Sequence, residues 1–133
     1  MIIIDASVAN KLVLPLEENH NKVKEIFRKH AQSIEEIVVP ELVLYEIANT
    51  LATKSAITLD KMVRSLSMIY KADLHIHHCQ ETEVKEAAKL AKKYKTSVYD
   101  MLYAVVAKKY NTILITADKQ FIKQTGFKFV MPL

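Results

Sequence analysis

Short apolar runs, separated by longer amphipathic stretches, constrain the fold of this chain more than any other feature. The runs "III" at residues 2–4, "IVV" at 37–39 and "TILIT" at 112–116 consist largely of isoleucine, leucine and valine. A strand that is apolar on both faces is typical of a parallel sheet, because helices cover both faces of such a sheet. Two further strands are predicted at residues 72–78 and 128–130.

Helical patterns fill the stretches between these strands. We predict helices at residues 5–14, 18–30, 40–54, 58–71, 82–94, 97–110 and 118–124, with Pro15 ending the first of them. Pro40 suits the first turn of its helix, because the N–H that proline lacks has no helical partner there. Strands that alternate with helices indicate parallel strands joined by crossover helices, so the sequence predicts an α/β sandwich.

Length and composition are typical of one globular domain. The 133 residues fit a single domain, residues 1–133, and half of them are hydrophobic, which suffices for a sizeable core. The single cysteine, Cys79, excludes an internal disulfide framework and favours a reducing compartment. No apolar run approaches the roughly 18 residues of a membrane span, and the N-terminus lacks the pattern of a signal peptide. We therefore expect a soluble, cytoplasmic protein.

Positive charge is concentrated in the second part of the chain. Residues 85–133 carry ten lysines against three acids, a net charge of +7, whereas residues 1–84 carry nine basic and twelve acidic groups. A basic half could attract RNA or DNA. On charge alone, a solvated lysine-rich helix face is the favoured interpretation.

Two aspartates follow predicted strands. Asp5 comes directly after the first strand, and Asp118 follows "TILIT" with only Ala117 between. Because parallel strands end at the same edge of a sheet, where α/β proteins bind ligands, both carboxylates are candidates for a site. Taken singly, each is better explained as a helix cap.

Two further acids lie on predicted helices. Asp100 stands three residues after Ser97 and matches a capping box. Glu46 lies mid-helix in an apolar segment and has Thr50, not a lysine, four residues later, so no simple helical ion pair explains it. A solvent-facing position is the ordinary alternative for Glu46.

A convergence of these four acids would require neutralisation, by protons or by a cation. Ligand sets made only of oxygen select hard ions such as Mg²⁺ or Mn²⁺. Such an ion can bind a phosphodiester oxygen and activate a water nucleophile.

Four segments together resemble a known family. They are "IIIDASV" with Asp5, "PELVLYEIANTL" with Glu46, "SVYDMLYAVVA" with Asp100 and "LITADKQF" with Asp118. In order and spacing they are similar to the PIN-domain ribonucleases, and within them to the VapC-type toxins of type II toxin–antitoxin pairs. No single segment is specific, but the ordered set spans essentially the whole chain.

The resemblance implies a three-layer α/β/α sandwich with a central parallel sheet, and cleavage of RNA by metal-assisted attack of water on phosphorus. It implies Mg²⁺ or Mn²⁺ held by Asp5, Glu46 and Asp100, with Asp118 completing the pocket, in some members through water. Ser7 and Thr116 stand where small hydroxyl residues accompany the acids, although local capping explains them equally well.

The resemblance also implies partners. Proteins of this type form homodimers and are held inactive by a VapB-type antitoxin, a peptide of which crosses the active-site groove with a basic side chain near the acids.

Other functions stay open on the sequence. A phosphoacceptor receiver module also places an aspartate at a strand end, but it needs paired acids where Asp5 stands alone. A haloacid-dehalogenase-like phosphatase expects a second acid where Ser7 stands. A catalytically inactive, RNA-binding PIN domain would retain the fold without the chemistry.

Two further features have ordinary explanations. His75, His77 and Cys79 would share one face of a strand and could bind a metal, although a polar face turned to water is the favoured interpretation. Tyrosines near the acids could stack on unpaired bases, but filling the core or a dimer contact is more common; they are Tyr45, Tyr99 and Tyr103.

Overall fold

A five-stranded sheet forms the centre of the computed structural model, which describes residues 1–14 and 17–133. Its strands are β1 (Ile2–Ile4), β2 (Ile37–Pro40), β3 (His75–His77), β4 (Leu114–Thr116) and β5 (Val130–Pro132). They lie in the order β3-β2-β1-β4-β5, and every neighbouring pair is parallel. The predicted end of the first helix at Pro15 falls outside the described residues.

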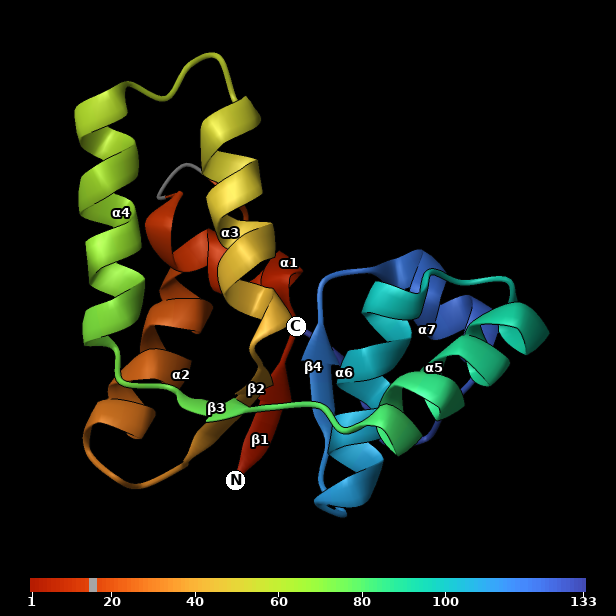
Figure 1. Ribbon diagram of the computed structural model, residues 1–133. Coiled ribbons are helices and arrows are strands. Elements are labelled where there is room, and N and C mark those ends of the chain that lie inside the picture. The colour runs from red at the N-terminus through yellow and green to blue at the C-terminus, as the bar shows by residue number, and fades with distance from the viewer. Residues whose placement is uncertain (15–16) are drawn as a thin grey trace.

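Helices cover both faces of this sheet (Figure 1). They are α1 (Ala6–Val13), α2 (His20–Ala31), α3 (Leu42–Thr53), α4 (Leu59–Lys71), α5 (Glu81–Tyr94), α6 (Val98–Lys109) and α7 (Lys119–Thr125). Figure 1 shows α1 to α4 on one side of the sheet and α5 to α7 on the other. Right-handed crossovers explain this division, because the chain moves from β1 to β3 in one direction and returns to β4 and β5 in the other. The predicted three-layer α/β/α sandwich is therefore confirmed.

The core lies where the strands are apolar on both faces. All residues of β1 and β2 are buried, and Ile3 and Ile4 have no exposed surface. Helix α6 packs against both of these strands. Within the described residues, no helix has the length and apolar character needed to span a bilayer.

Several boundaries differ from the prediction: β3 and β4 are shorter than the predicted strands at 72–78 and 112–116, and the elements around Pro40 and Val130 are shifted. Pro40 is the last residue of β2 and not the first turn of a helix. It is tolerated because β1 pairs only with Ile37 and Val38, so no strand needs the N–H that Pro40 lacks, and the next N–H, of Glu41, donates to the carbonyl of His77.

The last strand begins two residues later than predicted. The N–H of Val130 donates to the carbonyl of Phe127, so residues 127–130 form a turn. The residues that pair with β4 are Val130 to Pro132.

The topology places a switch point at β1 and β4. These two strands are neighbours, and their register pairs Ile4 with Ile115. The helix after β1 and the helix after β4 lie on opposite faces of the sheet, so the strand order reverses here. In parallel sheets, such a switch point at the carboxyl ends of the strands is where ligands bind.

Candidate active site

All four predicted acids line one pocket at this switch point. The pocket has a volume of about 240 Å³ and contains Asp5, Glu46, Asp100 and Asp118 in its wall. Asp5 follows β1, Glu46 lies on α3, Asp100 is in the first turn of α6, and Asp118 precedes α7. The structure therefore brings together side chains from four separate elements; their roles in catalysis and metal binding stay predictions.

Asp5 is held by donors of its own helix. One carboxylate oxygen accepts the N–H of Val8 at 3.0 Å and the hydroxyl of Ser7 at 2.5 Å, so Asp5 caps α1. Burial raises the pKa of this carboxyl group, and hydrogen bonds from Ser7 and Thr116 oppose that rise only in part. Asp5 therefore caps α1 and lines the pocket at the same time, because the cap uses only one of its two carboxylate oxygens.

The two predicted hydroxyl residues connect this corner of the sheet. Ser7 Oγ accepts the N–H of Ala117 at 2.9 Å, which joins the start of α1 to the connection after β4. Thr116 Oγ1 accepts the N–H of Asp118 at 2.9 Å, and Asp118 in turn accepts the N–H of Phe121 as the cap of α7. These bonds fix the backbone that carries two of the acids.

Glu46 has a partner that the sequence did not reveal. The hydroxyl of Tyr103, a core residue with 1% of its surface exposed, donates to the Glu46 carboxylate from across the sheet. Burial raises the pKa of Glu46, the Tyr103 bond lowers it, and the charges of Asp100 and Asp5 raise it. Because 57 residues separate Tyr103 from Glu46, no local pattern could have indicated this contact.

Asp100 is fixed at the start of α6. Ser97 Oγ accepts the N–H of Asp100 at 3.0 Å as the cap of the helix, and its hydroxyl donates to the Asp100 carboxylate at 2.5 Å. The capping interpretation is therefore right, and the same contact holds the carboxylate at the pocket.

A neutral pair extends the wall of the pocket. Asn10 Nδ2 lies 3.3 Å from Thr50 Oγ1, and both residues line the pocket beside the acids. Asn10 Oδ1 is buried and has no hydrogen-bond partner among the described residues. The position of Thr50, one helical turn after Glu46, is the sequence signal that places it on the same face of α3.

The pocket wall contains four carboxyl groups and, among the described residues, no basic group to balance them. Within the described part of the chain, no lysine, arginine or histidine lines it. Its acids are nevertheless not packed into one tight cluster, since the only group of three ligating side chains found within 4.8 Å of one another in that part of the chain is His77, Cys79 and Glu83. An ion between the four acids would therefore keep water ligands, as Mg²⁺ usually does.

The other two tyrosines that the sequence places near the acids lie at the surface. Tyr45 and Tyr99 have 63% and 62% of their surface exposed, and the hydroxyl of Tyr45 donates to Glu41. Neither fills the core, unlike Tyr103, and stacking of Tyr99 on a base beside Asp100 stays a prediction.

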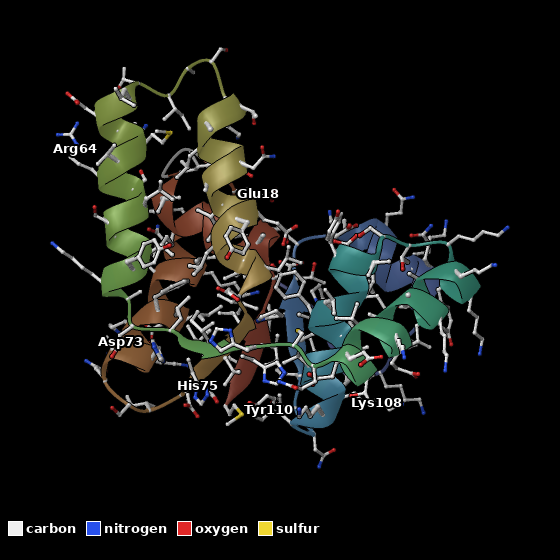
Figure 2. All side chains as sticks on the ribbon, viewed as in Figure 1. Glu18, Arg64, Asp73, His75, Lys108 and Tyr110 are labelled. Atoms are coloured by element: carbon white, nitrogen blue, oxygen red, sulfur yellow. The ribbon has the colours of Figure 1, made fainter. Side chains whose placement is uncertain are left out.

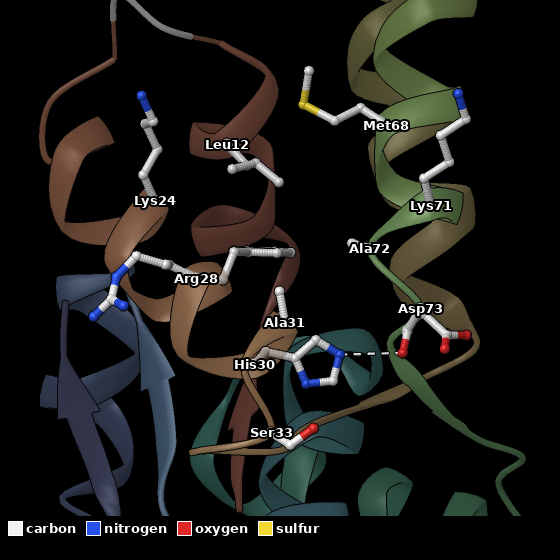
Figure 3. Close-up of a pocket in the computed structure, with 11 residues that line it drawn as sticks. Leu12, Lys24, Arg28, His30, Ala31, Ser33, Met68, Lys71, Ala72 and Asp73 are labelled. Carbon is white, nitrogen blue, oxygen red and sulfur yellow. Dashed lines mark hydrogen bonds between the residues drawn. The ribbon is translucent and has the colours of Figure 1, made fainter.

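A larger hollow lies away from the acids, between α2 and α4 (Figure 3). It has a volume of about 700 Å³ and combines apolar residues such as Phe27 and Met68 with the cations Lys24, Arg28 and Lys71. A hydrogen bond across it joins a ring nitrogen of His30 to the carbonyl of Asp73. Size alone does not select the candidate site, because this hollow contains a single carboxylate while the smaller pocket contains four.

Comparison with known proteins supplies a family. The model of the PIN domain matches residues 2–127. Among curated proteins, Ribonuclease VapC3 of Pyrobaculum aerophilum is 29% identical over 129 residues, which are 92% of this chain and 93% of the relative.

Solved structures give the same fold. VapC20 of Mycobacterium tuberculosis, described as a Sarcin-Ricin loop cleaving toxin, superposes with a TM-score of 0.73 at 15% identity, covering 98% of this chain and 97% of its own. A toxin–antitoxin complex from Klebsiella pneumoniae contains a chain with a TM-score of 0.72 at 13% identity, with 98% and 96% covered. At these identities the structures support the fold and not a particular activity.

Proposed function

This chain belongs to the PIN domain family, and on that premise we propose that it is a metal-dependent endoribonuclease, the toxin of a VapBC toxin–antitoxin pair. The observation that carries the proposal is the convergence of Asp5, Glu46, Asp100 and Asp118 on one pocket. A receiver module has no support in the structure or the comparisons. An inactive, RNA-binding PIN domain is distinguished by the assay below.

The donor set fits a hard divalent ion. Every ionisable group in the described wall of the pocket is a carboxyl or phenol, and burial raises the pKa of both Asp5 and Glu46. These carboxylates need a counter-charge to ionise together, and oxygen ligands favour Mg²⁺ or Mn²⁺ over zinc. We assign the ion to Asp5, Glu46 and Asp100, with Asp118 acting directly or through water.

A bound divalent ion supplies a counter-charge for a phosphodiester oxygen and acidifies a water that attacks phosphorus. The chain itself orients the carboxylates for this task. Ser7 and Val8 orient Asp5, Tyr103 orients Glu46, and Ser97 orients Asp100, so each carboxylate is held at the pocket before RNA binds.

RNA, an antitoxin and a second copy of the chain are the proposed partners. The name of the curated relative and the complex from Klebsiella pneumoniae support the first two. Exposed lysines of α5 and α7 could hold the phosphate backbone, and Figure 2 shows nitrogen-tipped side chains extending outward from α5. A VapB-type peptide with a basic side chain would inhibit by neutralising the acid pocket. Homodimer formation and a cytoplasmic location complete the proposal.

RNA cleavage by the purified chain tests the proposal. We expect Mn²⁺ or Mg²⁺ to activate cleavage of a structured RNA, and Asp5→Asn and Asp100→Asn each to reduce the rate at least a hundredfold. Asp60→Asn, which alters an exposed acid on α4, is the matched control and should cleave normally. A wild-type chain that binds RNA but does not cut it with any divalent ion would favour the inactive alternative.

A further inference from the structure

A second group of ligating side chains lies at the edge of the sheet, at the end of β3, in the connection that follows it and in the first turn of α5. An imidazole nitrogen of His77, the sulfur of Cys79 and a carboxylate oxygen of Glu83 lie within 4.8 Å of one another. None of the three lines the acid pocket. His77 and Glu83 are buried, with 8% and 7% of their surfaces exposed, and Cys79 is partly buried. We propose that these three residues form a zinc site, separate from the acids.

The separation of His77 and Glu83 is close to that of two ligands in a tetrahedral site. His77 Nε2 lies 3.0 Å and 3.1 Å from the two carboxylate oxygens of Glu83. Zinc bonds of about 2.0–2.1 Å place nitrogen and oxygen ligands roughly 3.3 Å apart, and a bond of about 2.3 Å places sulfur roughly 3.6 Å from each. Zinc therefore requires His77 and Glu83 to separate by only a few tenths of an ångström, and the Cys79 sulfur, which lies within 4.8 Å of both ligand atoms, to stand roughly 3.6 Å from each.

Neighbouring groups already orient two of the ligands. The Nδ1 atom of His77 lies 3.1 Å from the hydroxyl of Tyr110, and the two rings meet edge to face, which leaves Nε2 directed at Glu83. Glu83 accepts the N–H of Gln80 at 2.6 Å in the capping box of α5. A partner on the second nitrogen of a ligating histidine is typical of zinc sites, because it fixes the ring and raises its basicity.

His75, which the sequence offered beside His77 and Cys79 as the less favoured possibility of a metal site, is not part of the group. His75 is exposed and lies 2.8 Å from Glu36 on the outside of the sheet (His75 and Tyr110 are labelled in Figure 2). Strand β3 ends at His77, so the alternation that would align His75 with Cys79 does not continue. The helix that follows supplies Glu83 instead.

The chemistry of this group differs from that of the acid pocket. One nitrogen, one sulfur and one oxygen ligand suit zinc, whereas four oxygens suit Mg²⁺ or Mn²⁺. Three protein ligands leave a fourth position for water. Because β3 is an edge strand, a zinc ion bound here would cross-link the edge of the sheet to α5.

Lys109 would compete with zinc for the carboxylate of Glu83. Its ammonium group lies 2.9 Å from Glu83 in the metal-free chain, and its side chain is about half exposed. A divalent ion beside Glu83 would repel this ammonium group, which is free to turn into solvent. Lys109 therefore weakens zinc binding, although it stabilises the metal-free protein.

Metal titration of the full chain tests the site. Co²⁺ added to the metal-free protein should give a thiolate-to-cobalt charge-transfer band that saturates at one equivalent. In competition with a chromophoric chelator, Zn²⁺ should bind at least tenfold more weakly to Cys79→Ala and at least threefold more tightly to Lys109→Met. A band that persists in Cys79→Ala, or equal zinc affinity in wild type and Cys79→Ala, would overturn the proposal in favour of a simple ion pair.

Two controls separate this site from its surroundings. His78→Ala removes an exposed histidine that pairs with Glu41, and it should leave the cobalt band unchanged. The double variant Asp5→Asn/Asp100→Asn should also retain the band, so loss of nuclease activity and loss of the zinc site are independent results. A band that disappears with His78→Ala or with the acid variant would assign the metal elsewhere and overturn the proposal.

Discussion

Asp5 is a buried carboxylate whose charge opposes folding when no metal is bound. Its pKa is higher in the folded chain than in the unfolded chain, chiefly because of burial. A folded state that binds more protons loses stability as the pH rises through that pKa. Asp5→Asn keeps a capping side chain, so it should stabilise the metal-free protein at pH 7 by about 1 kcal/mol, or raise Tm by about 4 °C.

Thermal unfolding between pH 4 and pH 8 in a chelator checks this expectation. The Tm advantage of Asp5→Asn should grow with pH and shrink towards acid, and added Mn²⁺ should stabilise wild type more than the variant. A variant that is less stable than wild type at every pH would show that the charge of Asp5 is compensated within the fold.

Tyr103 acts on the same pocket through Glu46. Its hydroxyl lowers the pKa of Glu46, against the larger effect of burial. Tyr103→Phe removes that bond, so Glu46 should ionise at higher pH. The acidic limb of the pH–rate profile of cleavage should then shift to higher pH. A bond to a charged group contributes about 1.5–3 kcal/mol, which corresponds to a rate loss of about tenfold or more on that limb.

Cleavage rates measured from pH 5 to pH 9 at saturating Mn²⁺ would reveal the shift. Tyr70→Phe, an exposed tyrosine on α4, serves as the control and should leave the profile in place. An unshifted profile for Tyr103→Phe would mean that its hydroxyl only fills space in the core.

Two helix caps allow an effect on folding stability to be distinguished from an effect on RNA cleavage. Ser97 caps α6 and also donates to Asp100, while Thr58 caps α4 through the N–H of Lys61, away from the pocket. Replacing either with alanine should cost about 1 kcal/mol of stability. Only Ser97→Ala should reduce cleavage, because only that hydroxyl orients a carboxylate.

Denaturant unfolding and RNA cleavage of the two variants provide the comparison. Equal losses of stability with a severalfold loss of activity in Ser97→Ala alone are expected. Equal activity in both variants would show that the Ser97 hydroxyl has no role beyond the cap.

The elements show what the sequence could predict. Apolar runs located the strands, and two aspartates after strands were placed at one sheet edge because parallel strands share a direction. Pro40 and residues 128–129 were misassigned, because pairing partners and turns decide where a strand ends. The Tyr103–Glu46 contact was beyond prediction, since it depends on how helices on opposite faces of the sheet meet.

The candidate second metal group shows the same limit. Alternation along an expected strand brought His77 and Cys79 together as possible ligands, although Cys79 lies just beyond β3. Glu83 was not identified, because it comes from the first turn of a separate helix. Local patterns locate possible ligands along one element, and only tertiary packing decides which of them meet.

At the scale of the whole molecule, the uneven charge predicts where RNA lies. Residues 85–133 carry a net charge of +7 against −3 for residues 1–84, and α7 begins directly after Asp118. Lys119 and Lys123, both exposed and one helical turn apart, are therefore the cations that we expect to contact phosphates next to the pocket. Lys119→Gln/Lys123→Gln should weaken RNA binding at low salt and flatten its salt dependence by roughly 0.7 in log–log slope for each lost contact.

Fluorescence anisotropy with a single-stranded RNA, without divalent ions and at several salt concentrations, measures both quantities. The matched control, Lys22→Gln/Lys29→Gln, removes the same charge from exposed positions on α2. Because long-range attraction depends on net charge, both variants should lose some affinity, but a local phosphate contact reduces the slope further only in the α7 variant. Identical salt-dependence slopes for the two variants would mean that RNA affinity depends on the overall charge of the chain and not on lysines beside the acids.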